Sequence, residues 1–421
     1  MQRDEEISGW ALGRIYPTPD QVPEGWELVT LTDVAQLETG HTPSKDKSQY
    51  WNGDIPWVSL HDTKNLDGLR IDETQQTISP LGLANSSARL LPEGTVVFSR
   101  TATVGKATIL GHEMATSQDF ANYICGDQLH NEYLAHLFRF MKPEWERLMA
   151  GSTHNSIYME VFRKLQILLP PLEEQKSIAE ALSDVDALLA SIDAAIEKKR
   201  NVKTATMQRL LTGEERLPGF DGEWESEPLG RLLDFQNGVN AGKEAYGKGM
   251  PFANVLEVVE NTHIKISDIP GRVDVPSEMR KKHSVQSGDI LFNRTSETRE
   301  EVGLASTYVG DEPILFGGFV IRGRPVSGAL NQAYAGYALR APSVRKQIIS
   351  SGQGAIRSNI GQERLAEVEI PLPSLDEQRA IAEVLSDMDA EIEAWEKRRA
   401  KTEAVKTGMM QELLTGETRL V

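Results

Sequence analysis

The sequence predicts an α+β protein of two pseudo-repeated α/β lobes, joined by two long helices that pack as an antiparallel coiled coil. The first observation is a long internal repeat: residues 169–217 and 372–420 align without a gap, and 26 of the 49 positions are identical. The second is an apolar seam in each copy, at alternating steps of four and three residues, which is typical of a coiled coil. The third is length, because 421 residues suit two domains better than one core.

The repeated segments are predicted to be helices over residues 173–213 and 376–416. Two seams in one chain most simply bury against each other, so we expect the helices to pair. Acidic pairs begin each helix, where the helix dipole is positive, and a glycine closes each helix as a C-cap. The seam positions are Ile178, Leu182, Val185, Leu189 and Ile192 in the first copy and Ile381, Leu385, Met388, Ile392 and Trp395 in the second.

The predicted lobes cover residues 25–172 and 214–375, and residues 1–24 form a separate N-terminal segment. A weak repeat relates the lobes, since "GWELVTLTDVAQLETG" resembles "EWESEPLGRLLDFQNG" and "EGTVVFSRT" resembles "SGDILFNRT". The second pair predicts a turn and then an alternating strand that ends in Arg-Thr. One amphipathic helix is expected next in each lobe, over about 133–148 and 334–348, followed by a polar loop with glycine. The segment "ATSQDF" of the first lobe has no clear counterpart in the second.

Composition is that of a soluble globular protein and leaves a nucleic-acid partner open. The net charge of −17 by itself disfavours phosphate binding. However, residues 25–172 hold 12 basic and 17 acidic groups and residues 218–375 hold 17 and 20, so the lobes are only mildly acidic. No apolar stretch approaches the roughly 20 residues of a membrane span, and the acidic start is unlike a signal peptide, so we expect a cytoplasmic protein. The single cysteine, Cys125, excludes an intramolecular disulfide and is interpreted as a core residue.

Equivalent strand ends and the polar loops after them are candidates for DNA contact. Arg100 and Arg294 end the alternating strands and are followed by Thr101 and Thr295, so a guanidinium and a hydroxyl could together contact a phosphate or a base. A structural arginine that pairs with a carboxylate is the alternative. The loops offer groups that can read base edges, and a polar surface loop without a ligand is the alternative there. The loop candidates are His154, Asn155, Ser156 and Tyr158 in the first lobe and Arg357, Ser358 and Asn359 in the second, with Ser117 and Gln118 as weaker candidates.

Basic runs and catalytic patterns add no further site. Residues 198–200 and 397–399 lie midway along the predicted helices, where charge runs are usually solvated. The basic residues 280–282 could contact phosphate, but they fit a loop of solubilising charge at least equally well. The segment "GVNAGKEAY" has Glu244 where a phosphate-binding loop requires Ser or Thr. No spacing of His, Cys and carboxylates indicates a metal site. The chain is therefore expected to be non-catalytic, with no metal site of its own.

Several segments resemble the specificity (S) subunits of type I restriction-modification systems: "LPPLEEQ" and "LPSLDEQ", "FSRT" and "FNRT", "ATSQDFANY" and "GSTHNSIYMEVFRKL". The resemblance covers nearly the whole chain from about Val22. It implies that each lobe is a target recognition domain that reads one half of a bipartite site in double-stranded DNA, and it favours DNA contact for the loop candidates. It implies that the helices set the spacer between the two half-sites and that they dock methyltransferase (M) subunits. Two M subunits are expected, and restriction (R) subunits are possible further partners. S-adenosylmethionine, and ATP with Mg, would then act in partner subunits, and this chain would need no cofactor.

Two other classes of function remain open at this point. A self-contained DNA methyltransferase or nuclease would be supported by a motif such as Asn-Pro-Pro followed by an aromatic residue, which the sequence lacks. A coiled-coil scaffold with protein-binding lobes would suit the acidic charge. Binding of the chain and its methyltransferase partner to random duplexes would separate a DNA-specificity subunit from a scaffold.

Overall fold

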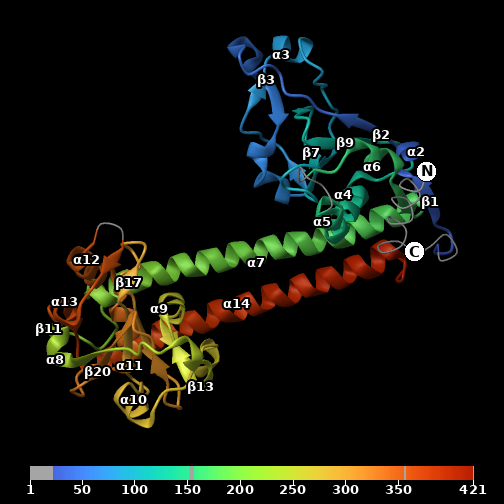
Figure 1. The fold of residues 1–421 in the computed structure, drawn as a ribbon. Helices are drawn as coiled ribbons and strands as arrows, with labels where there is room; N and C mark the ends of the chain where they lie inside the picture. Colours follow the sequence, from blue (N-terminus) through green and yellow to red (C-terminus); the bar gives the residue numbers. More distant parts are fainter. Residues whose placement is uncertain (1–21, 151–155, 355–356, 421) are drawn as a thin grey trace. The chain divides into compact units, whose positions relative to one another are not determined.

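The computed structural model describes residues 22–150, 156–354 and 357–420. The chain divides into two compact units: unit 1 holds the residues up to Asp193 and those from Arg398, and unit 2 holds residues 194–397 (Figure 1). Each unit contains one lobe and parts of two long helices, α7 (Leu172–Thr212) and α14 (Leu375–Thr415). Both helices begin and end one residue earlier than the sequence predicted.

The lobe of unit 1 (lobe 1) is built on two sheets. The larger has the strand order β2-β9-β6-β7-β4 and the smaller the order β5-β3-β8, and all neighbours are antiparallel except β4 with β7 and β3 with β8. The strand predicted from "VVFS" is β6, in the centre of the larger sheet, and its four residues are buried. The strands are β1 Glu27–Thr30, β2 Ala35–Thr39, β3 Trp51–Val58, β4 Arg70–Ile71, β5 Thr77–Ile78, β6 Val96–Ser99, β7 Ala107–Leu110, β8 Ala115–Thr116, β9 Phe120–Cys125 and β10 Gln166–Leu169, and β10 pairs with β1.

The single amphipathic helix predicted over 133–148 is wrong, because the structure has two helices there. α4 (Asn131–Phe140) ends before Pro143, which is tolerated in the first turn of α5 (Lys142–Ala150) but would disrupt the interior of one continuous helix. The predicted apolar side chains nevertheless share one core. The remaining helices of lobe 1 are α2 Leu31–Val34, α3 Pro80–Ala84 and α6 Met159–Lys164, with 3₁₀ turns at Ser48–Tyr50, Leu60–Asp62 and Asn65–Asp67.

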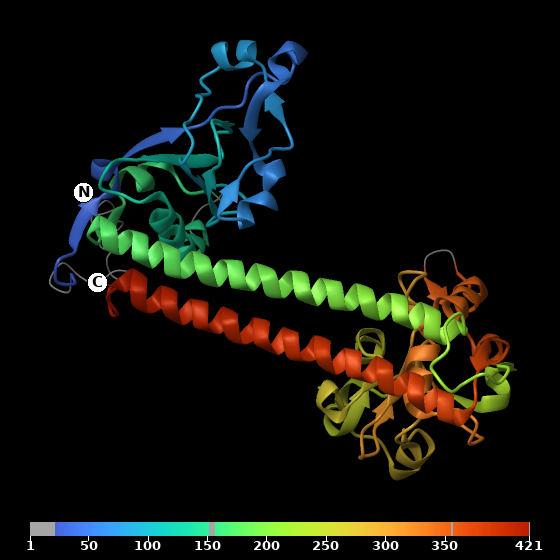
Figure 2. The same cartoon turned by 180° about the vertical axis from the view of Figure 1, so that it is seen from behind.

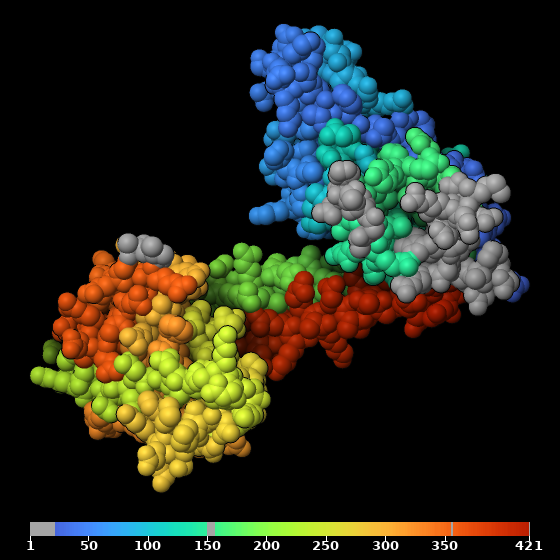
Figure 3. Space-filling view, viewed as in Figure 1, coloured from blue at the N-terminus to red at the C-terminus, as the bar shows by residue number. Residues whose placement is uncertain are grey.

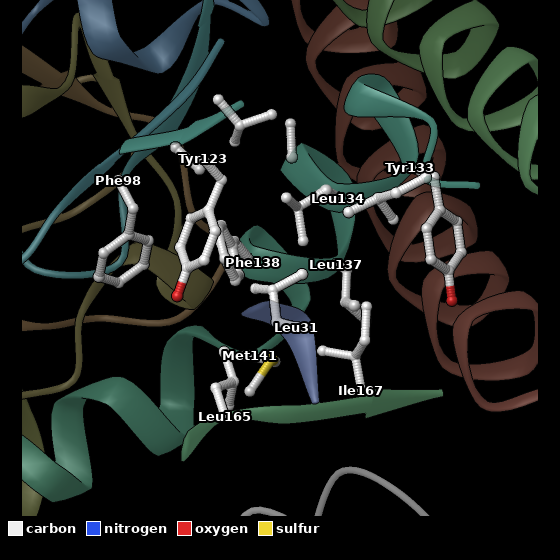
Figure 4. Packing of buried hydrophobic residues seen from close by; sticks show 14 of the residues in the cluster. Leu31, Phe98, Tyr123, Tyr133, Leu134, Leu137, Phe138, Met141, Leu165 and Ile167 are labelled. Carbon is white, nitrogen blue, oxygen red and sulfur yellow. The ribbon is translucent and has the colours of Figure 1, made fainter. Parts of the chain in front are cut away.

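The core of lobe 1 lies between α4 and the larger sheet (Figure 4). Phe98 from β6 packs edge-on against Phe138 from α4, with ring centres 5.2 Å apart. The Tyr133 ring is fully buried, and its hydroxyl donates to the carbonyl of Leu168 at 3.0 Å. Burying one such side chain stabilises a fold by about 1.5–3 kcal/mol, so this layer fixes the sheet that carries the candidate residues.

The lobe of unit 2 (lobe 2) repeats the two sheets of lobe 1 strand for strand and adds the short pair β17–β21, where lobe 1 has only the isolated bridge Thr101–Ser156. Its larger sheet has the order β12-β20-β16-β18-β14 and its smaller sheet the order β15-β13-β19, and β14–β18 and β13–β19 are again the parallel pairs. The segment "ATSQDF" does have a counterpart, because β8 within it corresponds to β19. The strands are β11 Glu225–Pro228, β12 Leu233–Asn237, β13 Tyr246–Ala253, β14 His263–Ile264, β15 Arg272–Val273, β16 Ile290–Asn293, β17 Thr295–Ser296, β18 Ala305–Tyr308, β19 Leu315–Phe316, β20 Val320–Pro325, β21 Ser358–Asn359 and β22 Glu369–Leu372.

The helices of lobe 2 follow the same plan. The helix predicted over 334–348 is again two, α11 and α12, because Pro342 opens the second at its first position. Figure 3 shows α12 and α13 (orange) on one part of the lobe 2 surface and α10 (yellow) on another. The helices are α8 Leu229–Leu232, α9 Val255–Glu260, α10 Ser277–Lys282, α11 Gln332–Ala338, α12 Pro342–Ser351 and α13 Gln362–Ala366, with 3₁₀ turns at Lys243–Ala245 and Ile266–Asp268.

The repeated glutamine of the two helix signatures ties each lobe to its long helix. Gln175 is fully buried; its amide donates to the carbonyls of Gln128 and Pro170 at 2.9 and 2.8 Å, and its Oε1 accepts the backbone N–H of His130 at 2.8 Å. Gln378 makes the equivalent three bonds in unit 2. Since both ends of each amide are satisfied by backbone, the signature has a structural explanation.

The repeated glutamate forms the centre of a cluster that we call the clamp. In unit 1, Glu174 accepts from Arg419 Nε and Nη2 at 2.6 and 2.7 Å and from Trp26 Nε1 at 3.0 Å. Burial raises the pKa of the Glu174 carboxyl, but the bonds from Arg419 and Trp26 outweigh burial and hold the pKa below its ordinary value. Each clamp joins the start of one long helix to the segment after the other.

The clamp of unit 2 has the same geometry. Glu377 accepts from Arg216 Nε and Nη2 at 2.5 and 2.7 Å and from Trp224 Nε1 at 3.0 Å. The Arg216 guanidinium lies 5.3 Å from the centre of the Trp224 ring, within the range of a cation–π contact. The weak sequence repeat that aligned the two tryptophans therefore marks equivalent structural positions.

Ion pairs join α7 to α14 within each unit, and the helices lie side by side in both views (Figures 1 and 2). Residue numbers fall along one helix as they rise along the other, so the helices are antiparallel, as predicted. The basic residues 198–200 and 397–399 were predicted to be solvated, but Lys199, Arg200 and Arg399 instead form ion pairs between the helices. The pairs are Lys406–Asp186 (2.6 Å) and Arg399–Asp193 (2.5 Å) in unit 1, and Lys199–Glu391 (2.5 Å), Arg200–Glu396 (2.5 Å) and Lys203–Asp389 in unit 2.

The apolar seams are buried, although not only against each other. Seven of the ten predicted seam residues are buried, and Val185, Met388 and Trp395 are partly exposed. The first seam positions of α7, Ile178 and Leu182, belong to the core of lobe 1, which explains their complete burial. The equivalent positions of α14 belong to the core of lobe 2. Each long helix is therefore partly a lobe helix. Among the helices that the structure describes, none is long and apolar enough to cross a membrane.

Candidate nucleic-acid interface

Arg100 follows β6 directly, and the backbone of two loops holds its side chain. Its Nε and Nη2 donate to the carbonyl of Gln118 at 3.1 and 2.7 Å, and its Nη1 donates to the carbonyl of Ile157 at 3.0 Å. Burial lowers the pKa of the Arg100 guanidinium, while the Asp119 carboxylate acts in the opposite direction. These bonds use three of five N–H groups and position both loops. Contact of Arg100 with DNA stays a prediction.

The loop before α6 reaches the same place. Ser156 forms an antiparallel bridge with Thr101, and its hydroxyl donates to Thr101 Oγ1 at 3.2 Å. Tyr158 is 62% exposed beside this bridge. His154 and Asn155 lie outside the described residues. The structure therefore brings the strand end and the loop together, as a shared binding surface would require.

Gln118 and Ser117 have different surroundings in the loop after β8. The Gln118 side chain is exposed, and its Oε1 accepts from the Thr42 hydroxyl at 2.6 Å, so its amide N–H₂ group is presented from a fixed side chain. Ser117 is buried, and its hydroxyl donates to Asp119 at 2.8 Å. This geometry favours Gln118 as a base-contacting residue and Ser117 as support for the loop, and contact by either stays a prediction.

The candidates of lobe 2 gather in the equivalent place, although they are held more loosely. Arg294 Nη1 donates to the carbonyl of Gly318 at 3.5 Å, a long contact. Thr295 Oγ1 donates to Asn359 Oδ1 at 2.7 Å across the pair β17–β21. Ser358 is buried in that pair. Arg357 is exposed and faces Glu297 at 3.4 Å in a weak surface pair.

The two clusters share one backbone pattern. The N–H of Arg100 donates to the carbonyl of Asp119, and the carbonyl of Arg100 accepts from Ile157. The N–H of Arg294 donates to the carbonyl of Phe319, and the carbonyl of Arg294 accepts from Ile360. We call these equivalent sites the strand-end clusters. Their side chains differ, so one scaffold presents two chemistries.

An open hollow of about 630 Å³ adjoins the cluster of lobe 2 and adds residues that sequence analysis missed. Arg294 and Asn359 line it together with Asn237 from the end of β12 and Gln353 from the loop after α12. The alignment of Gly40 with Gly238 marked the strand end beside Asn237 and could have indicated this residue. No pattern marked Gln353.

Other candidate chemistry does not develop into a site. Burial raises the pKa of the Cys125 thiol to about 12, which agrees with an unreactive thiol at the core boundary. Arg280 on α10 pairs with Asp274 at 2.6 Å and donates to the carbonyl of Val275, so it is partly structural. Within the described part of the chain, no group of three or more His, Cys, Asp or Glu residues could hold a metal ion.

Two pseudo-repeated lobes with equivalent polar clusters, on a pair of antiparallel helices, define a two-lobed specificity protein. The family model for the type I restriction modification DNA specificity domain matches residues 23–199 and 224–404. The matched residues exceed half of the chain, and the chain belongs to this family.

Curated relatives match over most of the chain. The MjaVIII specificity subunit of Methanocaldococcus jannaschii is 25% identical over 426 residues, covering 95% of this chain and 94% of the relative. The EcoKI specificity subunit of Escherichia coli K12 is 24% identical over 408 residues, covering 90% and 85%. Both are named type I restriction enzyme subunits.

Solved structures show the same fold. A chain from a structure described as the basis of complex assembly and conformational transition of the type I R-M system has a TM-score of 0.60 and 21% identity, covering 95% of this chain and 100% of its own. The S subunit from M. genitalium has a TM-score of 0.57 and 15% identity, covering 94% and 97%.

Proposed function

We propose that this chain is the DNA-specificity subunit of a type I restriction-modification complex. Each lobe reads one half of a bipartite site, and the paired helices set the spacer between the half-sites and dock M subunits, two per chain. The observation that carries this proposal is the pair of strand-end clusters. Equivalent backbone with different side chains, such as Gln118 and Asp119 in lobe 1 where lobe 2 has Gly318 and Phe319, suits two different half-sites.

The chemistry of modification and cleavage belongs, in this proposal, to the partners. The M subunits bind S-adenosylmethionine and flip the target base, and R subunits use ATP with Mg when they join. The present chain contributes recognition and no catalytic residue or cofactor, and it works in the cytoplasm, where its DNA lies. Methyl transfer by rigorously purified chain without M subunits would contradict this division of labour.

A lobe exchange tests the proposal directly. Residues 25–168 are replaced by the equivalent lobe of a relative with a different specificity, and the methylated bases in cells that also express the M subunit are mapped by long-read sequencing. One half of the methylated motif should change, and the other half should stay.

The wild-type chain and an exchange of the second lobe are the controls. A motif that changes in both halves would show that the lobes do not read independently. Absence of any bipartite motif with the wild-type chain and its M subunit would favour a scaffold over a specificity subunit.

A further inference from the structure

Phe319 is a large apolar side chain that lobe 2 leaves in solvent. It is 60% exposed, although its neighbours Phe316 and Val320 are fully buried. A single exposed apolar residue is ordinary on a protein surface, so its position decides its meaning. Its carbonyl accepts the backbone N–H of Arg294 at 2.8 Å, which places Phe319 in the strand-end cluster of lobe 2.

The backbone that carries Phe319 is fixed. The N–H of Gly317 donates to the carbonyl of Ala253 at 2.9 Å. A Cβ added to Gly318 would lie 2.0 Å from Oδ1 of Asn240, so glycine lets the Asn240 side chain approach this backbone closely. Because hydrogen bonds hold this backbone, little conformational entropy is lost when the Phe319 ring contacts a partner.

Lobe 1 has different chemistry at the equivalent point. Asp119 takes the place of Phe319, accepting the N–H of Arg100 at 3.0 Å, and its carboxylate is tied to Ser117. The exposed side chain of that loop is the polar Gln118. A surface position that is polar in one lobe and apolar in the other, on the same backbone, fits a residue that distinguishes two base sequences.

We propose that Phe319 is a specificity-determining residue of lobe 2, which contacts one base pair of the second half-site through its apolar ring. This inference rests on the proposed function. An apolar side chain reads the C5-methyl group of thymine in the major groove, and an apolar ring also inserts between base pairs from the minor groove. The thymine methyl group and the faces of stacked bases are two sources of the same chemistry, because each presents an apolar surface of a base to the ring.

The test compares the wild-type chain with Phe319→Ala, each assembled with the M subunits of its own system. Methylated-site mapping should return an unchanged first half-site and a second half-site that has become degenerate at one position. Affinity for the original duplex should fall about 5- to 150-fold, as for one mismatched base pair. Duplexes with uracil in place of thymine at that position distinguish the two sources. Loss of affinity for them indicates the methyl group, and retained affinity with increased fluorescence of an adjacent 2-aminopurine indicates insertion.

Val326→Ala is the matched control, because Val326 is 61% exposed at the opposite end of β20 and should change neither motif nor affinity. Phe319→Gln keeps an extended side chain but removes the apolar ring, and it replaces the alanine variant if that variant unfolds. An unchanged motif and affinity in a folded Phe319 variant would overturn the inference while leaving the proposed function intact. A wild-type complex that reads no bipartite site would overturn the proposed function itself.

Discussion

Arg100 and Arg294 occupy equivalent strand ends, yet removing them should have different effects. Arg294→Ala should weaken DNA binding by the assembled complex by about 1–3 kcal/mol if the contact is to a base edge. The free energy of unfolding of the Arg294→Ala chain should change little, because the Arg294 guanidinium makes only a long contact of 3.5 Å with the carbonyl of Gly318. Arg100→Ala should weaken binding and also lower the free energy of unfolding by about 2–4 kcal/mol, because three hydrogen bonds to two loops are lost.

Fluorescence anisotropy over a range of salt concentrations measures binding, and urea unfolding measures stability. Arg100→Lys is the control for charge without the guanidinium fork. If both alanine variants keep the wild-type affinity and salt dependence, the two arginines support the loops and do not touch DNA.

His136 should make the stability of unit 1 depend on pH. Its ring is fully buried in α4, with Nε2 at 3.1 Å from the Ser183 hydroxyl, and burial depresses its pKa to about 4, although Asp186 acts in the opposite direction. The folded pKa is lower than the unfolded value of about 6.5, so the unfolded state binds the proton first as pH falls. The stability present above pH 6.5 should decrease by roughly 3 kcal/mol as pH falls to 4.

Unfolding experiments between pH 7 and pH 4 on wild-type chain and on His136→Gln measure this dependence. The variant should have a shallower pH slope than the wild type. His112→Gln, at an exposed position, is the matched control and should keep the wild-type slope. Equal slopes in His136→Gln and wild type, or an NMR titration of His136 near pH 6.5 in the folded chain, would contradict the argument.

At the scale of elements, the clamps should set how firmly each long helix holds to its lobe. Arg216→Ala leaves the Glu377 carboxylate almost fully buried without its partner, so unit 2 should lose more stability than the removal of an exposed ion pair would cost. Arg209→Ala, in the last turn of α7, is the control: the ion pair of Arg209 with Glu215 is half exposed on both sides and should contribute at most about 1 kcal/mol.

Hydrogen exchange measures this prediction because it reports protection in each unit separately. Arg216→Ala should reduce protection in unit 2 and leave unit 1 near the wild type, and Arg419→Ala should do the reverse. Equal losses of protection in Arg216→Ala and Arg209→Ala would show that the burial of Glu377 does not make the Arg216–Glu377 ion pair more stabilising than an exposed pair.

Much of this element plan could be predicted from the sequence, for physical reasons that differ between elements. The long helices were predictable because a seam of many regular steps is a strong signal. Strands such as β4 and β5 have two residues each, too few for any alternation to be visible. Pro143 and Pro342 did mark helix breaks, but the continuing apolar period concealed them.

The candidate site was only partly predictable. Arg100 was found because it ends a strand, but the carbonyls that hold it belong to residues 18 and 57 positions away, and no local pattern reveals such contacts. Gln175 was seen only as part of a repeated signature, although its burial explains why a glutamine stands there. Phe319 carried no signal, because one apolar residue beside a strand predicts burial.

At the scale of the whole molecule, the proposed spacer role makes the length of the helix pair testable. Inserting four residues, about 6 Å of helix, into both helices should lengthen the spacer by one or two base pairs at about 3.4 Å each. The insertions belong after Ala194, which follows Asp193 and precedes Arg200 along α7, and after Lys397, which follows Glu396 and precedes Arg399 along α14. Inserting in α7 alone, between Ile192 and Val202, would also shift these ion pairs out of register.

Methylated-site mapping of the double insertion should return the original half-sites with a longer gap. Some affinity should be lost, since four residues turn a helix by about 40° beyond a full turn while two base pairs turn DNA by roughly 70°. A chain with four substitutions at the same places is the control for local disruption. The same gap as in the wild type, or altered half-sites, would mean that these helices do not set the spacer.

The division of the chain also bears on how it is made. Unit 2 is one continuous stretch of sequence. Unit 1 consists of two segments, and the whole of unit 2 lies between them in the sequence. At about 5–20 residues per second, a ribosome spends roughly 10–40 s on residues 194–397. Throughout that interval Glu174 has no Arg419, and the core of lobe 1 lacks Leu413 and Leu414. A neighbouring nascent chain could supply its own copy of this segment, so the lobe that is synthesised first is completed last and is the one exposed to swapping.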